Sequence, residues 1–163
     1  MTGSTIFSKK LIKAPLCASL PKKHHTEALR IFKEIQIYMG DGPKGNKESS
    51  SFNTLTGIAN AVNRHGRELI DETFCQLIKQ TSNNPRNDSD SRGWELIVAC
   101  VYKCVPSAKL LPFLRFHVTR RMKEPTPRGS LAFRTWQRLL NDAVPKLPSS
   151  VREVTSQPAV YNT

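Results

Sequence analysis

Long apolar segments are missing from this 163-residue sequence, and so are the usual signatures of an enzyme. No run approaches the roughly 20 apolar residues that a membrane-spanning helix needs, and the amino-terminal residues do not form a secretory signal. Serine and cysteine occur without a nucleophile-elbow motif, and no histidine has neighbours that imply an activated nucleophile. We therefore expect a cytosolic protein without catalytic residues and without a small-molecule substrate.

Cysteine is also scarce, with four residues in the chain. Cys100 and Cys104 stand one helical turn apart, whereas a structural zinc site needs four ligands, usually with tighter cysteine spacing. Both lie near an apolar stripe, where free cysteine packs as a small hydrophobic residue. In the absence of a secretory signal we predict reduced thiols rather than a disulfide framework, and no bound metal.

A glycine-rich segment, GDGPKGNK at residues 40–47, lacks the order that a phosphate-binding loop requires. Asn46 stands where the lysine of such a loop should be, and the segment follows a predicted helix rather than a strand. We therefore predict no bound nucleotide and no other cofactor.

Acidic residues are few, because 13 Asp and Glu face 25 Lys and Arg, which gives a formal net charge of +12. The excess lies on both sides of a balanced middle segment. Residues 1–26 contain five lysines and no acid, and residues 103–138 contain nine basic residues and a single acid. Clustering of this kind attracts acidic protein segments, nucleic acid or anionic lipid, and it exceeds what solubility alone requires.

Apolar residues recur at three- and four-residue spacing, the pattern of amphipathic helices, and no segment alternates with a period of two. Within residues 69–105, two such runs flank the polar segment 83–90, which predicts a helical hairpin at the centre of the core. The fold class that follows is all-α, a single compact bundle of about six helices around this hairpin. The other helices are predicted at residues 26–39, 52–64, 107–123 and 130–144.

Local signals predict how several helices begin and end. Gly40 is placed for a left-handed cap, and Ser107 for the amino-terminal cap of the helix that follows it. Asp71 and Glu72 read as an acidic pair at a helix start, where the helix dipole favours carboxylates. Pro112 is expected just past a first turn, where it would remove one hydrogen bond and bend the helix.

Large aromatic residues are few, and their surroundings predict two different roles. Trp94 and Trp136 are expected in the core. Phe113 and Phe116 fall on the same arc of a predicted helix as several basic residues. We expect both phenylalanines to pack against the amino-terminal leader, and an interaction surface beside the basic side chains is the alternative.

The basic carboxyl-terminal half supplies the candidate partner-binding residues. They come from two consecutive predicted helices and the turn between them, and they could form one continuous patch. The candidates are Lys109, Arg115, Arg120, Arg121, Lys123, Arg128, Arg134 and Arg138.

Four sequence motifs occur in a fixed order along the chain. They are IFKEIQIYMGD at residues 31–41, DETFCQLIKQT at 71–81, RGWEL at 92–96 and LPSSVREV at 147–154. Together with the leader, they closely resemble the myosin tail homology domain, the fourth of the named myosin-tail modules, over roughly residues 7–155.

The resemblance implies an all-helical module without catalysis, as found in the tails of certain myosins, kinesins and Rho-regulating proteins. It also implies binding to microtubules and acidic protein segments, often beside a FERM domain. The sequence departs from that pattern by stopping where a FERM domain would begin. We therefore expect a fragment, or a protein that uses the module alone.

These observations predict three parts: an extended leader packed on the domain at 1–25, the helical domain at 26–155 and a frayed tail at 156–163. The predicted function is docking of a basic surface on microtubules or an acidic partner peptide, in a cytoplasmic, cytoskeleton-associated motor or adaptor tail. Binding of nucleic acid or anionic lipid is less favoured, because nucleic-acid motifs are absent and stacking aromatics are few. A structural spacer for a neighbouring domain is a further alternative.

Overall fold

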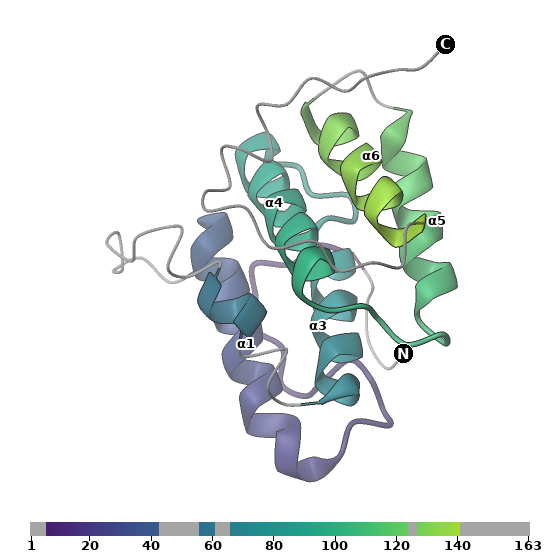
Figure 1. The fold of residues 1–163 in the computed structure, drawn as a ribbon. Helices are drawn as coiled ribbons and strands as arrows, with labels where there is room; N and C mark the ends of the chain where they lie inside the picture. The colour runs from purple at the N-terminus through teal and green to yellow at the C-terminus, as the bar shows by residue number, and fades with distance from the viewer. Residues whose placement is uncertain (1–5, 43–55, 61–65, 124–126, 141–163) are drawn as a thin grey trace.

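The fold is all-α, as predicted, in a computed structural model that describes residues 6–42, 56–60, 66–123 and 127–140 (Figure 1). No strand occurs within these ranges, and none of their helices is long and apolar enough to cross a membrane. Residues 56–60 are helical and belong to the predicted helix at 52–64, whose other residues lie outside the described part. The remaining elements are the 3-10 helix η1 (Lys22–His24) and the α-helices α1 (His25–Met39), α3 (Arg67–Gln80), α4 (Asn87–Lys103), α5 (Leu111–Met122) and α6 (Pro127–Leu140).

Helix α4 occupies the middle of the bundle and packs against α1, α3 and α6 (Figure 1). Its central side chains Trp94, Leu96 and Ile97 are completely buried, as is Val101 one turn further on. Burying a large apolar side chain contributes about 1.5–3 kcal/mol, so this helix carries much of the hydrophobic stabilisation. Cys100 and Cys104 are buried among the same residues, which confirms their packing role.

Helices α3 and α4 form the predicted hairpin, and Gly93 lets them approach closely. A Cβ atom at this position would lie 2.5 Å from the Thr81 side chain and 3.0 Å from that of Met39. The polar connection is shorter than predicted, because α4 already begins at Asn87. Asp88 and Asp90 therefore lie in the first helical turn, where the helix dipole favours acidic side chains, rather than in the loop.

The ends of α1 and α5 illustrate one correct and one incorrect local prediction. Gly40 has a left-handed φ of 77° and caps α1, as predicted. Pro112 lies within the first turn of α5, where its missing N–H breaks no helical hydrogen bond, so the predicted bend has no cause. Ser107 precedes α5 by a full turn, and Leu110 is the N-cap residue of this helix. The Ser107 hydroxyl donates to Asp71 at 2.5 Å and accepts from the Leu110 N–H at 3.4 Å, so it supports the turn before the helix.

The last helix also begins earlier than the sequence suggested. Helix α6 starts at Pro127 rather than at Ser130, because proline is well suited to a first helical position. Residues 141–144, assigned to this helix by the sequence, lie outside the described part. So does the side chain of Trp136.

Asp71 and Glu72 do not stand at a helix start, because α3 begins at Arg67. Glu72 is completely buried and accepts hydrogen bonds from the backbone N–H groups of Leu16 and Cys17, at 2.9 and 2.7 Å. Asp71 likewise accepts from the backbone N–H of Ser107 at 2.8 Å. The two carboxylates thus satisfy donors from distant segments, which the dipole interpretation missed.

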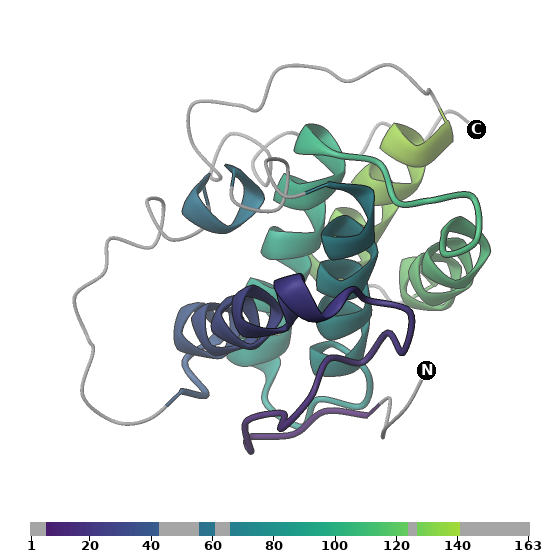
Figure 2. The ribbon, with the colours of Figure 1, turned by 90° about the horizontal axis from the view of Figure 1, so that it is seen from below.

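The leader crosses α1 and α3 and is held by further polar contacts (Figure 2). Gln36 and Gln80 each donate from the side-chain amide to the Ser8 carbonyl at 3.0 Å, and Lys79 Nζ donates to the Ile6 carbonyl at 2.7 Å. The Cys17 thiol lies 3.4 Å from that of Cys75, and this contact, together with burial, raises the pKa of Cys17. Irregular backbone therefore finds its hydrogen-bond partners on two helices.

Replacing Glu72 with Gln should destabilise the fold by about 3 kcal/mol, since two buried N–H donors would face a neutral amide in place of a carboxylate. Urea unfolding followed by circular dichroism measures the change. The matched control is Glu68→Gln on the exposed surface of the same helix, which should cost less than about 1 kcal/mol. Equal losses in the two variants would contradict the role assigned to Glu72.

Candidate docking surface

Helices α5 and α6 lie side by side at one edge of the bundle and carry most of the candidate basic residues (Figure 1). Lys109 lies in the turn before α5, Arg120 in its last turn and Lys123 at its carboxyl-terminal end. All three side chains are exposed. They form a basic surface along α5 that contains no acidic residue between residues 103 and 123.

The other candidates are less accessible or lie outside the described part. Arg115 and Arg134 are partly buried, and burial lowers the pKa of the Arg134 guanidinium. The side chains of Arg128 and Arg138, on α6, are outside the described residues. Among the candidates whose side chains are described, Lys109, Arg120 and Lys123 are the exposed ones.

Arg121 points into the protein although its neighbour Arg120 points outward. Its Nη2 donates to the Thr81 carbonyl at 2.9 Å and lies 3.6 Å from the completely buried carboxylate of Asp90. The guanidinium carbon is 5.8 Å from the centre of the Trp94 ring, a cation–π distance. With 16% of its side chain exposed, Arg121 connects α5 to α3 and α4 and offers little to a partner.

His117 completes this buried contact. Its ring stacks on Trp94 with centroids 5.1 Å apart and planes 4° from parallel, and its Nε2 lies 2.8 Å from Thr81 Oγ1. The Thr81 hydroxyl donates its one proton to the Leu77 carbonyl, so Nε2–H of the neutral ring is the donor to Thr81. Burial, and then the charges of Arg121 and Arg120, lower the pKa of His117 to about 4.

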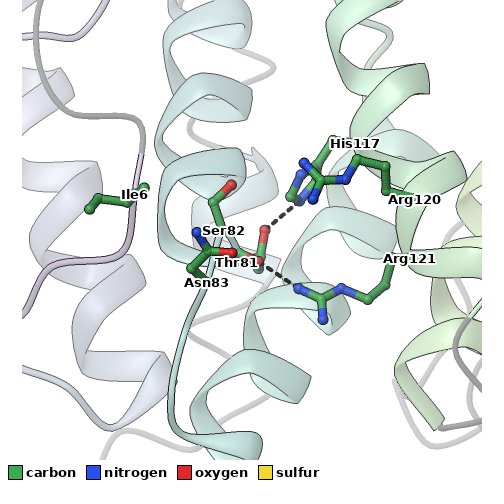
Figure 3. Close-up of a pocket in the computed structure, with 7 residues that line it drawn as sticks. All are labelled: Ile6, Thr81, Ser82, Asn83, His117, Arg120 and Arg121. Atoms are coloured by element: carbon green, nitrogen blue, oxygen red, sulfur yellow. Dashed lines mark hydrogen bonds between the residues drawn. The ribbon is translucent and has the colours of Figure 1, made fainter.

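A polar cavity of about 280 Å³ opens between the leader, the end of α3 and α5 (Figure 3). One wall is formed by Ile6 and residues 81–83, and the other by His117, Arg120 and Arg121. His117 and Arg121 are held by Thr81, as the dashed lines in Figure 3 show. Arg120 reaches the same cavity from the outer face of α5, so its charge lines the opening.

Phe113 and Phe116 do not pack against the leader, and the prediction that they would is wrong. Their exposed fractions are 59% and 66%, which makes them the most exposed large apolar side chains of the described part. Leu114 and Val118 supply the buried face of α5, so the phenylalanines fall on the opposite side. The Arg120 guanidinium lies 5.8 Å from the Phe116 ring centre. We call Phe113, Phe116 and Arg120 the aromatic–basic stripe.

Helical spacing alone places the three residues of this stripe near one another on the helix, although it did not show that they are exposed. At 100° per residue, Phe113 and Arg120 are two turns apart and share a face, and Phe116 is within 60° of Phe113.

In the described part of the chain, no group of three or more His, Cys, Asp or Glu side chains could hold a metal ion. The surface therefore offers positive charge and aromatic area to a partner.

Comparison with known proteins decides the family. The sequence profile of the MyTH4 domain matches residues 58–156, which is more than half of the chain. The chain belongs to the MyTH4 domain family. The resemblance inferred from the sequence motifs is thereby confirmed.

Relatives of this MyTH4 domain are myosins. The chain is 33% identical over 117 residues to a myosin-I heavy chain of Dictyostelium discoideum, covering 71% of this chain and 5% of that protein. It is 37% identical over 97 residues to human unconventional myosin-XV, covering 59% of this chain and 3% of that one. This MyTH4 domain therefore matches a small part of these much longer motor proteins.

Solved structures share the fold. The MyTH4-FERM MF2 domain of Dictyostelium discoideum myosin VII, in a mutant form, superposes with a TM-score of 0.78 at 28% identity, over 87% of this chain and 30% of that one. The human myosin 7b carboxyl-terminal MyTH4-FERM domain, in complex with the harmonin-a PDZ3 domain, gives 0.76 at 25% identity, over 91% and 31%. The chain spans less than a third of each of these solved chains.

Neighbouring arginines of the MyTH4 domain should respond differently to substitution. Arg121→Met removes the Arg121 charge from beside the buried Asp90 carboxylate and should destabilise the fold by about 3 kcal/mol. Arg120→Met removes an exposed charge and should change stability by less than about 0.5 kcal/mol. Urea unfolding of both variants measures the difference, and similar losses would show that Arg120 is also structural.

Stability of the MyTH4 domain should fall in mild acid because of His117. An unfolded chain protonates this ring near pH 6.5, whereas the folded domain does so near pH 4. Stability from the neutral ring is therefore complete above about pH 6.5 and is lost as the pH falls through this window, by about 2 kcal/mol at about pH 4.5. Urea unfolding at about pH 7.5 and about pH 4.5 gives the fall in unfolding free energy for the wild type and for His117→Gln. This fall should be about 2 kcal/mol smaller in the variant, which lacks the titrating ring. Identical losses would mean that His117 is not the titrating group.

Proposed function

We propose that this MyTH4 domain is a non-catalytic docking module that binds acidic protein segments through the outer surface of α5. The observation that carries the proposal is the exposed set of Lys109, Arg120 and Lys123, in a segment that contains no acidic residue. Complementary charge accelerates encounter and selects acidic partners, and its effect weakens as salt screens the surface. The acidic carboxyl-terminal tails of tubulin on the microtubule surface and acidic partner peptides both meet this requirement.

Membership in the MyTH4 family supports a role in a motor or adaptor tail. The curated relatives are myosins, and one solved MyTH4-FERM unit was captured in complex with a PDZ domain. We therefore propose a parent protein in which a FERM domain follows this module, in the cytoplasm and associated with the cytoskeleton.

Within the chain, we propose residues 1–25 as a leader that folds with the helical domain at 26–155, because the hydrogen bonds of Ser8, Leu16 and Cys17 join the leader to α1 and α3. Residues 156–163 form the proposed tail.

The sequence analysis left two alternatives to this docking function. Nucleic acid or anionic lipid would also be attracted to a basic surface, although no observation on the fold favours either. A spacer that binds nothing is supported less well, because the leader does not cover the three exposed basic side chains. The binding experiment separates these alternatives.

Charge reversal on α5 should abolish microtubule co-sedimentation. The triple variant Lys109→Glu, Arg120→Glu and Lys123→Glu changes exposed residues and leaves Arg121 intact, so folding should be preserved. We expect pelleting of the wild type at low salt, weaker pelleting at moderate salt and none for the variant.

The matched control reverses the charge of three other lysines, Lys22→Glu, Lys23→Glu and Lys33→Glu. They are exposed on η1 and α1, at the other side of the bundle (Figure 1). This control has the same net charge and should pellet like the wild type. Equal loss in both triple variants would show a non-specific charge effect, and unchanged pelleting of the α5 variant would exclude this surface. Tighter binding to duplex DNA or anionic vesicles than to microtubules or an acidic peptide would favour the alternatives.

A further inference from the structure

The outer surface of α5 combines two exposed phenylalanines with positive charge, and charge alone gives no reason for the phenylalanines. Phe113 and Phe116 are three positions apart on a helix, so their rings lie on one face, with Arg120 following one turn later. An exposed aromatic pair next to cations is typical of interaction sites, where aromatic residues and arginine supply most of the binding energy. A partner that is only acidic would leave the aromatic area in water.

The cavity beside Arg120 adds a second feature to the same surface. It is about 280 Å³ in volume, and its polar walls include Ser82, Asn83 and Arg120. Arg121 is already occupied by Asp90 and Thr81, whereas Arg120 has no carboxylate partner within the described residues and contacts the Phe116 ring. A carboxylate that enters this opening would therefore meet the guanidinium of Arg120.

We propose that the aromatic–basic stripe binds an amphipathic acidic protein segment rather than a purely acidic tail. Apolar side chains of the segment cover Phe113 and Phe116, and one of its carboxylates pairs with Arg120 at the cavity. Lys109 and Lys123 flank the two ends and attract the remaining acidic side chains. The inference rests on the proposed function and selects a class of partner within it: a segment with apolar residues at helical spacing and acids between them.

A membrane surface fits these residues less well. Leu114 and Val118 are buried in the core, and Leu111 and Met122 are partly buried against it, so only the two phenylalanines of α5 are large, exposed apolar side chains. Helices that lie in a membrane interface bury a wide apolar face. A narrow aromatic pair with a neighbouring polar cavity suits the side chains of one peptide instead.

Two synthetic peptides of equal net charge test the proposal by fluorescence anisotropy with the full chain. Both are about 18 residues long and rich in glutamate; one has leucine at every third or fourth position, and the other has serine there. We expect the leucine peptide to bind about tenfold more tightly, as its apolar contacts add to the charge. The double variant Phe113→Ala and Phe116→Ala should lower its affinity to that of the serine peptide and leave serine-peptide binding unchanged.

The matched control is Leu11→Ala, which removes an exposed apolar side chain from the leader and should bind both peptides like the wild type. Arg120→Gln should weaken both peptides. Equal affinities of the two peptides, with loss of both in the charge-reversed α5 variant, would overturn the aromatic inference while the proposed function stands. If neither peptide binds, both proposals fail.

Two further measurements identify competing occupants. Sedimentation equilibrium of the wild type and the double phenylalanine variant shows whether a second copy of the chain covers the stripe. Anionic vesicles that displace the leucine peptide in a phenylalanine-dependent manner would assign the stripe to lipid. Either result would overturn the proposed peptide site, and a monomer without vesicle competition supports it.

Discussion

The stacked contact between Trp94 and His117 determines which side of α5 faces the solvent. Trp94 is completely buried at the centre of α4, and His117 of α5 lies parallel to it. Thr81 and Arg121 extend this contact to α3, so three helices meet at one point. Because His117 and Arg121 must face inward, Phe113, Phe116 and Arg120 are turned outward together. The proposed docking surface is thus a consequence of packing on its opposite face.

Buried polar side chains serve as connectors throughout this fold. Glu72 accepts hydrogen bonds from backbone N–H groups of the leader, and Asp71 accepts one from a backbone N–H group in the segment before α5. The completely buried side chain of Asp41 pairs with Arg86 at 2.7 Å and so joins the end of α1 to the start of α4. A helical bundle with irregular connections must satisfy their backbone donors and buried charges, since an unpaired group inside the protein is costly. These contacts join the leader and the connections to the helices of the bundle.

Adjacent basic residues have separate tasks in this MyTH4 domain. Arg121 lies beside the buried carboxylate of Asp90, so its charge acts within the fold and not at the surface. Arg120, the next residue toward the amino terminus, keeps its charge at the surface beside an exposed ring. The net charge of +12 therefore overstates what a partner encounters. Binding strength depends on the few cations that packing leaves accessible and on the aromatic area between them.

Apolar spacing in the sequence was sufficient to predict an all-α fold, the central hairpin and the burial of Trp94, since a 3.6-residue period requires no knowledge of partners. The left-handed cap at Gly40 was equally predictable, because it is a local backbone property. Tertiary packing alone decided that Glu72 binds the leader, that Arg121 is internal and that Phe113 and Phe116 are exposed. The reason is physical: periodicity shows which residues share a face of their own helix, but the contacts with other segments decide what each face meets.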